Sequence, residues 1–207
     1  MPTLKLTYFD SPGRGESVRI ALHMGKIPFE DHRLKFPEFG EARARGDFPL
    51  NAVPTLEVDG FPIVQTAAML RYVAKIGDPS LYPSDPAAAL IVDSALDTLN
   101  DTLTHAMRPS MFERDPAKKL AMRAELAAGP LAQVLAYIEG LIARSGGPFV
   151  AGKTLSIADI VAAQQILQIR SGRLDGLTEA TLEPYPRLRA LTEAYSQDPR
   201  VLAYANR

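Results

Sequence analysis

The sequence predicts two domains: a small α/β domain over residues 1–78 and an all-α domain over residues 87–207, joined by a linker at 79–86. Three observations predict this organisation. β-rich and helical segments alternate in the first part, prolines crowd the linker, and every later segment has a helical pattern. The length of 207 residues agrees, since it lies between one and two domains of about 150 residues each.

The first domain is expected to contain a small mixed sheet covered by helices. Residues 53–64 give the clearest signal, because two β-rich runs flank Asp59-Gly60, a pair favoured in tight hairpin turns. Residues 35–52 are rich in Pro, Gly, Arg and Glu, which predicts a loop with room for one short helix. The other elements are predicted as extended runs over 4–9 and 28–34 and helices over 14–24 and 66–76.

The second domain is predicted to be helical throughout. Three prolines in the ten residues from Gly77 to Pro86 stop any helix there and make a stiff connector. A capping box follows at Ser156 and Asp159, whose side chains can each bond the other's backbone N–H. Loss of the Ser156 cap should cost roughly 0.5–2 kcal/mol. The predicted helices cover 87–108, 117–143, 156–171 and 187–197.

Composition excludes several classes of protein. The 46% hydrophobic and 23% charged fractions are those of a globular chain. No run of about 18 consecutive apolar residues is present, and the first five residues lack the features of a secretory signal. We therefore expect a cytoplasmic protein without a membrane span. The 23 basic and 24 acidic residues balance, which argues against binding to nucleic acid.

The chain contains no cysteine. This excludes disulfides, thiolate metal sites and a cysteine nucleophile, and therefore a thiol–disulfide oxidoreductase of the glutaredoxin type. The histidines His23, His32 and His105 are far apart in the sequence, so no histidine-rich metal motif is available. Any thiol chemistry must use a thiol that a ligand supplies.

Several short motifs occur in an order and spacing that one protein family shares. They are Tyr8-Phe9 before a helix start at Gly13-Arg14, the run Val-Pro-Thr-Leu-Glu-Val-Asp-Gly at 53–60, Gln65-Thr66 leading into Leu70-Arg71-Tyr72, and Ser156-Ile157-Ala158-Asp159. Over essentially the whole chain, this pattern resembles the cytosolic glutathione S-transferases, specifically the tyrosine-type classes alpha, mu, pi and sigma. The resemblance implies a thioredoxin-like first domain (βαβ-ββα, with a mixed four-stranded sheet), an all-α second domain and a homodimer. It also implies glutathione as co-substrate and no metal.

The resemblance gives the catalytic role to Tyr8, with Arg14 beside it at the helix start. A tyrosine at a strand end is ordinarily a packed aromatic with a satisfied hydroxyl, and that alternative remains. In the catalytic interpretation, the hydroxyl donates a hydrogen bond to the glutathione sulfur. A free thiol has a pKa of about 8.5, and a hydrogen bond to a charged group contributes roughly 1.5–3 kcal/mol, or about one to two pKa units. The helix dipole adds to this effect.

Two further motifs are expected to bind the glutathione backbone. The resemblance implies a cis Val53-Pro54 bond and pairing of the Val53 backbone with glutathione, in the manner of an added strand. The alternative is a proline that only starts a strand. Gln65 and Thr66, at a helix start, are implied to hold the γ-glutamyl carboxylate. The alternative is that Thr66 serves as an ordinary N-cap.

The remaining glutathione contacts are implied less directly. Asp101 of one subunit is implied to reach the γ-glutamyl amine bound to the other, although a row of aspartates spaced by four is usually a solvated face. Arg45 is the candidate for the glycyl carboxylate, although most loop arginines are solvated. Phe39 lies where relatives have a Trp, and it cannot donate a hydrogen bond. Ala52 replaces a polar residue before Val53, and Asn51 is the candidate to compensate.

The pocket for the electrophile is expected to be apolar and adaptable, as methionine-rich pockets are. For each residue alone, ordinary core filling is an equally good interpretation. An apolar loop side chain, Leu50 or Phe48, is a candidate plug for a neighbouring subunit. The expected pocket residues are Phe9, Met107, Met111, Phe112 and Tyr204.

The function predicted from these residues is conjugation of glutathione to small hydrophobic electrophiles through an activated sulfur. The same sulfur could reduce organic hydroperoxides or support an isomerisation. The alternative is a glutathione-binding scaffold of the same fold without significant catalysis, which Phe39 and Ala52 favour.

Overall fold

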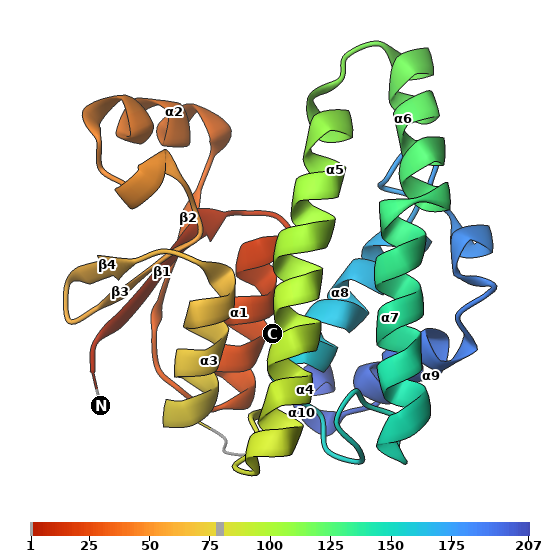
Figure 1. The fold of residues 1–207 in the computed structure, drawn as a ribbon. Helices are drawn as coiled ribbons and strands as arrows, with labels where there is room; N and C mark the ends of the chain where they lie inside the picture. The colour runs from red at the N-terminus through yellow and green to blue at the C-terminus, as the bar shows by residue number, and fades with distance from the viewer. Residues whose placement is uncertain (1, 78–80) are drawn as a thin grey trace. The chain divides into compact units, whose positions relative to one another are not determined.

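The computed structural model describes residues 2–77 and 81–207, with the side chains of residues 101–103 outside that description. The chain (Figure 1) divides into two compact units. The first unit ends at Tyr82 and also takes in Ala203–Arg207, and the second runs from Pro83 to Leu202. The sequence-based division placed residues 203–207 in the helical domain, whereas the structure groups them with the first unit.

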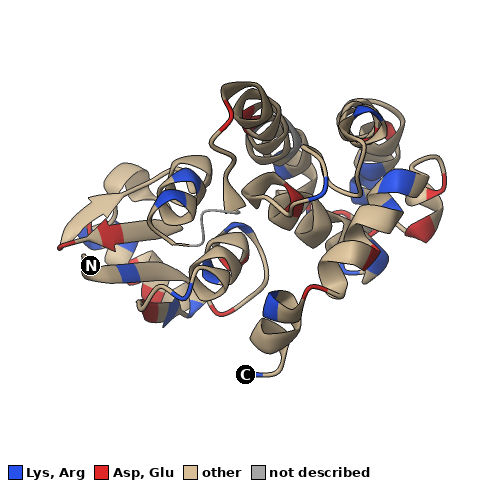
Figure 2. Ribbon diagram, turned by 90° about the horizontal axis from the view of Figure 1, so that it is seen from below, with Lys and Arg blue, Asp and Glu red and all other residues tan. Residues whose placement is uncertain are grey.

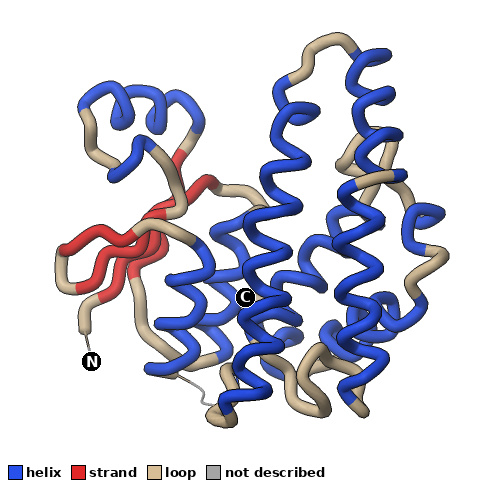
Figure 3. Tube along the Cα trace, viewed as in Figure 1, coloured by secondary structure: helices blue, strands red, loops and turns tan. Residues whose placement is uncertain are grey.

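The first unit is built on a mixed sheet in the order β2-β1-β3-β4, which confirms the predicted fold class. The first two strands are parallel, and the other two pairings are antiparallel. At the predicted hairpin, Asp59 and Gly60 both have positive φ, as a tight primed turn requires. The strands, red in Figure 3, are β1 (Leu4–Phe9), β2 (Glu30–Leu34), β3 (Thr55–Val58) and β4 (Phe61–Ile63).

Two helices of the first unit, α1 (Arg14–Met24) and α3 (Thr66–Ile76), confirm the predicted bounds and pack against each other (Figure 1). Their apolar faces are buried with the sheet. Leu6 of β1, Val18 of α1 and Leu70 of α3 have no exposed surface. The parallel β1–β2 pair requires a crossover, and α1 provides it.

The segment predicted as a loop with one short helix is largely helical, as α2 (Phe36–Arg45) followed by a single 3-10 turn, η1 (Pro49–Asn51). The Glu38 carboxylate caps the start of α2 by accepting from the Lys35 N–H at 2.8 Å. Gly46 ends the helix in the left-handed conformation that glycine adopts without strain. These local caps offset the Pro and Gly content that favoured a loop.

The second unit is helical, as predicted, but its helices differ from the expected ranges. The expected helix over 87–108 extends to Phe112 and contains a π-helical turn, and the one over 117–143 is divided at Gly129-Pro130. The last helix was not predicted. The elements are α4 (Pro86–Asp97), the π turn η3 (Thr98–Thr102), α5 (Leu103–Phe112), α6 (Pro116–Ala128), α7 (Pro130–Ser145), α8 (Ile157–Arg170), η4 (Glu179–Leu182), α9 (Pro186–Ser196) and α10 (Pro199–Ala205).

One helical stretch of the described chain, Pro116–Ser145, is long and apolar enough to cross a membrane by length and composition alone. Buried core helices of water-soluble proteins pass the same test, so this is weak evidence for a span. Charged residues of both signs occur along the elements of each unit (Figure 2).

The predicted capping box at the start of α8 is present. Asp159 is completely buried, and its carboxylate accepts from the Ser156 N–H at 2.8 Å, the Ser156 hydroxyl at 2.6 Å and the Val150 N–H at 2.9 Å. Burial raises the pKa of Asp159 to about 6, although these hydrogen bonds act in the opposite direction. The carboxylate therefore ties the preceding loop to the helix start.

This environment predicts a pH-dependent stability. Because the folded pKa lies above the ordinary 3.8, protonation of Asp159 favours the folded state; the contribution is complete below about pH 4 and is lost as pH rises through about 6. An Asp159→Asn variant cannot titrate. The free energy of unfolding of the wild type, relative to this variant, should fall by about 2–3 kcal/mol between about pH 4 and pH 7. Urea denaturation at several pH values measures it, and a difference that rises with pH would contradict the expectation.

Candidate functional site

Tyr8 lies near the end of β1, in the first unit, where it is 9% exposed. Its side chain belongs to a buried cluster with Leu34 and Val53. The hydroxyl has no hydrogen-bond partner among the described residues, yet it is not one of the fully buried polar atoms left unpaired. The hydroxyl is therefore open to a ligand, and the alternative of a packed aromatic with a satisfied hydroxyl does not describe it.

Two glycines allow the ring of Tyr8 to lie against the start of α1. A β-carbon added to Gly15 would have three atoms of the Tyr8 side chain within 2.6 Å, and one added to Gly13 would lie 2.6 Å from the Tyr8 hydroxyl. The hydroxyl consequently lies beside the backbone at the N-terminus of an 11-residue helix. Unpaired N–H groups and the dipole at such an end favour an anion.

Arg14 and Val53, both predicted site residues, are linked directly. The Arg14 guanidinium donates from Nη2 to the Val53 carbonyl at 3.2 Å. The predicted cis peptide bond at Val53-Pro54 is confirmed. Arg14 thus contacts the backbone of the predicted peptide-binding segment, and the structure gives no hydrogen bond between Arg14 and Tyr8.

Gln65 and Thr66 lie at the start of α3, as predicted. Their capping roles there differ from the interpretation of Thr66 as an ordinary N-cap. Gln65 is the N-cap, with its carbonyl accepting from the Met69 N–H at 3.1 Å, and Thr66 is the first helical residue. Thr66 as N-cap was therefore wrong. Gln65 has φ 78° and ψ 104°, a conformation that costs a non-glycine residue free energy and is often found at functional sites.

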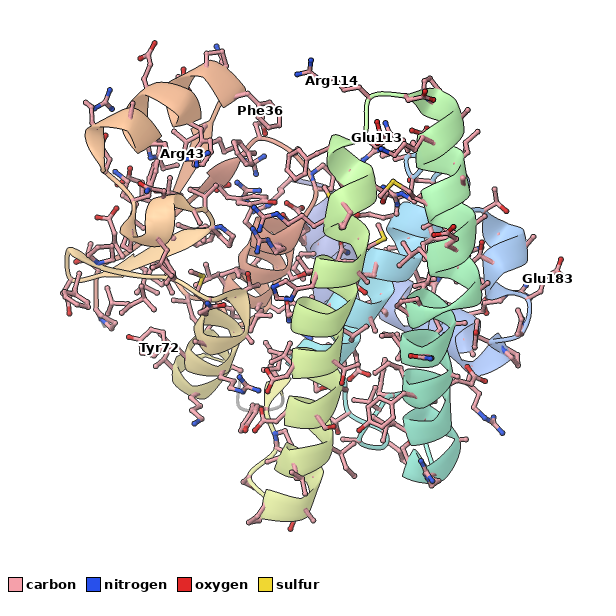
Figure 4. The ribbon with its side chains drawn as sticks, turned by 45° about the horizontal axis from the view of Figure 1, so that its top comes forward. Phe36, Arg43, Tyr72, Glu113, Arg114 and Glu183 are labelled. Carbon is pink, nitrogen blue, oxygen red and sulfur yellow. The ribbon has the colours of Figure 1, made fainter. Side chains whose placement is uncertain are left out.

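Phe39 is part of a group of phenylalanine rings that packs beside Tyr8, and the Phe39 side chain donates no hydrogen bond. Phe9 stacks on Phe36 with ring centroids 4.6 Å apart, meets Phe39 edge-on at 5.2 Å, and lies 5.3 Å from the ring of Tyr8. Phe36 begins α2 and is 72% exposed (Figure 4), so one face of its ring is open. Sequence reasoning did not single it out.

The other predicted residues are brought together only in part. Arg45 is exposed and donates to its neighbour Asp47 at 2.7 and 3.0 Å, while Asn51 has positive φ and is exposed. Met107, in the second unit, accepts from Arg123 at 3.5 Å. Met111 and Phe112 are exposed. The side chain of Asp101 lies outside the described residues.

A buried arginine that sequence reasoning missed lies behind Tyr8. Arg19 of α1 has no exposed surface, and its guanidinium carbon is 5.8 Å from the centre of the Tyr8 ring. It pairs with Glu16 at 3.2 Å and Asp31 at 2.8 Å, and donates to the Phe9 carbonyl at 3.1 Å. The usable signal was a charged residue within the apolar pattern of 14–24, with an acidic residue three positions earlier.

The sheet order and the helices of both units define a thioredoxin-like domain combined with a helical domain. The family described as "Glutathione S-transferase, N-terminal domain" matches residues 4–75, and "Glutathione S-transferase, C-terminal domain" matches residues 100–207. The chain therefore belongs to the cytosolic glutathione S-transferase family of enzymes.

Known relatives agree with this assignment. The chain is 32% identical to glutathione S-transferase 1 of Ascaris suum over 80% of each chain. It is 27% identical to hematopoietic prostaglandin D synthase of Gallus gallus, over 99% of this chain and 96% of the relative. A solved structure of prostaglandin synthase D from Nilaparvata lugens has a TM-score of 0.84 and 27% identity, covering 100% of this chain and 98% of that one.

The close approach at Gly15 makes a direct prediction. A Gly15→Ala variant forces the base of the Tyr8 side chain to shift, which should destabilise the protein by roughly 1–3 kcal/mol. Gly40, inside α2, has no atom within 4 Å of an added β-carbon. The matched control Gly40→Ala should therefore keep or raise stability, by about 0.5–1 kcal/mol. Thermal and urea unfolding measure both, and equal effects would show that the ring does not depend on Gly15.

Proposed function

We propose that the protein conjugates the thiolate of glutathione to small hydrophobic electrophiles, and that Tyr8 donates a hydrogen bond to the sulfur. The observation that supports this most directly is the unpartnered Tyr8 hydroxyl at the N-terminus of α1. Membership of the glutathione S-transferase family supports the co-substrate. On this proposal the protein is of the tyrosine type.

The chemistry needs no reactive group from the chain except a hydrogen-bond donor. The glutathione thiol releases its proton, the thiolate forms a carbon–sulfur bond, and a leaving group departs with its electron pair or the adduct takes up a proton. One charge-assisted hydrogen bond, worth roughly 1.5–3 kcal/mol, ionises about a quarter to three-quarters of the sulfur near neutral pH. The helix N-terminus adds favourable charge.

Glutathione would lie along the segment that follows the cis bond. The Val53 backbone, two residues before strand β3, is suited to pair with an extended peptide. Gln65 and Thr66 offer the N-terminus of α3 to the γ-glutamyl carboxylate. Phe39, Arg45, Asn51, Pro54 and Asp101 complete the proposed contacts, and Arg45 must release Asp47 to take part.

The proposed electrophile pocket is apolar. In the first unit, Phe9 and the exposed Phe36 supply stacked rings next to Tyr8, which suits a flat aromatic electrophile. Met107, Met111, Phe112 and Tyr204 remain proposed pocket residues. Met107 and Tyr204 have polar partners, Arg123 and Glu16 respectively, which a substrate would have to accommodate.

Removal of the Tyr8 hydroxyl tests the proposal. A Tyr8→Phe variant should bind glutathione with nearly unchanged affinity, while its turnover of an aryl halide near pH 7 falls roughly 8- to 25-fold, because the thiol returns toward its free pKa. Steady-state kinetics and calorimetric titration with glutathione separate the two effects. Unchanged turnover would remove Tyr8 from the mechanism. Wild-type protein that binds glutathione but turns over no aryl halide, hydroperoxide or isomerisable substrate would favour the scaffold alternative.

A second candidate function is isomerisation that uses glutathione without consuming it. Relatives named as prostaglandin D synthases align over nearly the whole chain, which supports this candidate. The same thiolate would add to the substrate and leave again after a bond rearrangement. Product analysis distinguishes the candidates, because conjugation consumes glutathione in proportion to product and isomerisation leaves its concentration unchanged.

We also propose that the protein is a cytoplasmic homodimer. Within the first unit, β3, β4 and α3 border an apolar hollow of about 410 Å³ that includes Phe61 and Tyr72, and Phe61 is 69% exposed. Figure 4 labels Tyr72 on α3. Leu50 is another exposed apolar side chain on this unit. An open apolar surface of this kind favours burial against a second copy.

The dimer makes its own prediction. A Phe61→Glu variant places a charge in the apolar surface and should shift the protein from dimer to monomer in sedimentation velocity experiments. Phe36→Glu, which changes an equally exposed phenylalanine outside this surface, should leave the dimer intact. A monomeric wild type would contradict the homodimer and the proposed contact of Asp101 across subunits, without affecting the role of Tyr8.

A further inference from the structure

The C-terminal segment Ala203–Arg207 belongs to the first unit and contacts α1 through Tyr204. The Tyr204 hydroxyl donates to Glu16 Oε1 at 2.6 Å, a hydrogen bond that spans 188 positions in the sequence. The His23 ring meets the Tyr204 ring edge-on at 5.4 Å, and the Arg207 guanidinium lies 3.6 Å from its centre. The ring is thus fixed from two sides and the hydroxyl from a third.

Glu16 links this segment to the buried arginine. Its second oxygen, Oε2, accepts from Arg19 Nη1 at 3.2 Å. The two carboxylate oxygens therefore have separate partners, one at the C-terminal end of the chain and one beneath Tyr8. The side chain of Glu16 is mostly buried, so both interactions act in an environment that screens charge weakly.

Arg19 in turn fixes the end of β1. Its Nε donates to Asp31 on β2 and its Nη2 donates to the carbonyl of Phe9, the residue after Tyr8. The guanidinium also lies against the Tyr8 ring at 5.8 Å. All three nitrogens have partners, so a change in the position of Glu16 must move the guanidinium or break one of these contacts.

From this continuous set of contacts we infer that Tyr204 is a positioning residue for the reaction: through Glu16 and Arg19, its hydroxyl holds Tyr8 in the place where it can stabilise the glutathione thiolate. This inference rests on the proposed function. It assigns Tyr204 a positioning role that acts through contacts within the first unit. The sequence had predicted Tyr204 only as a residue that lines the apolar electrophile pocket.

The physical mechanism is a competition for Glu16. While Tyr204 donates to Oε1, the carboxylate is held toward the C-terminal segment and shares its charge between two donors. Without that donor, Glu16 pairs with Arg19 alone and draws the guanidinium away from the Phe9 carbonyl and the Tyr8 ring. Burial raises the pKa of Tyr204 above its ordinary range. The hydrogen bond with Glu16 and the negative charge of Glu16 raise it further, so the hydroxyl keeps its proton.

The test is a Tyr204→Phe variant, which removes one oxygen and keeps the ring on His23 and Arg207. Absorbance of the thiolate against pH gives the pKa of enzyme-bound glutathione, and steady-state kinetics give kcat and KM. We expect the pKa of the bound thiol to rise and kcat near neutral pH to fall about three- to tenfold, with KM for glutathione within about twofold. The control Tyr185→Phe loses a comparable hydroxyl, bonded to the Ala132 carbonyl at 3.2 Å in the second unit, and should change none of these values.

Two further variants separate a positioning role from a general loss of stability. Glu16→Gln interrupts the link to Arg19 and should raise the pKa of the bound thiol as Tyr204→Phe does. The double variant should show no further rise, since both act along one path. In a Tyr8→Phe background, Tyr204→Phe should have no effect on the thiol. If Tyr204→Phe does not fold, Glu16→Gln carries the same test.

The outcomes are distinguishable from failure of the proposed function. If Tyr8→Phe leaves the pKa of the bound thiol unchanged, the role of Tyr8 itself is wrong and the inference falls with it. If Tyr8→Phe raises that pKa but Tyr204→Phe does not, the proposed function stands and the positioning role of Tyr204 is overturned. An effect of Tyr204→Phe that persists in the Tyr8→Phe background also overturns it.

Discussion

The candidate site depends on the close packing of one tyrosine ring against the backbone at the start of α1. Gly13 and Gly15 have no β-carbons. The Tyr8 side chain lies where the β-carbons of other residues at these two positions would be. This contact brings a phenol hydroxyl to a helix N-terminus, two features that each favour an anion. Because the chain has no cysteine, a thiolate stabilised by these features must come from a ligand.

A buried charge accompanies this arrangement. Arg19 is fully removed from solvent, and such a guanidinium is tolerated only when its donors are satisfied. Its partners come from α1, β1 and β2, so the requirement to satisfy one arginine fixes the relative positions of three elements around Tyr8. Asp159 does the same in the second unit, where a buried carboxylate joins the start of α8 to the loop before it.

Local signals in the sequence predicted most of the fold. The strand 4–9, the Asp59-Gly60 turn and helices 14–24 and 66–76 follow from periodicity and turn chemistry within a few residues. Helix 36–45 was expected only as a short helix within a loop, and the last helix was not predicted, because caps and tertiary packing overcame an unfavourable composition. At the site, Tyr8, Arg14, Val53 and Gln65 lie in short motifs, whereas Gly15 is visible only when the ring packed on it is known.

Non-local contacts explain why Tyr204 received only an apolar role from the sequence. No pattern within the last helix indicates that its hydroxyl meets a glutamate of the first helix, and a tyrosine near the C-terminus is consistent with many environments. The acidic residue itself was a partial signal, because Glu16 and Arg19 are one helical turn apart. The second carboxylate oxygen of Glu16 accepts from a further donor, the hydroxyl of Tyr204. The chemistry proposed for Tyr8 at the end of β1 is thereby linked to the C-terminal segment Ala203–Arg207.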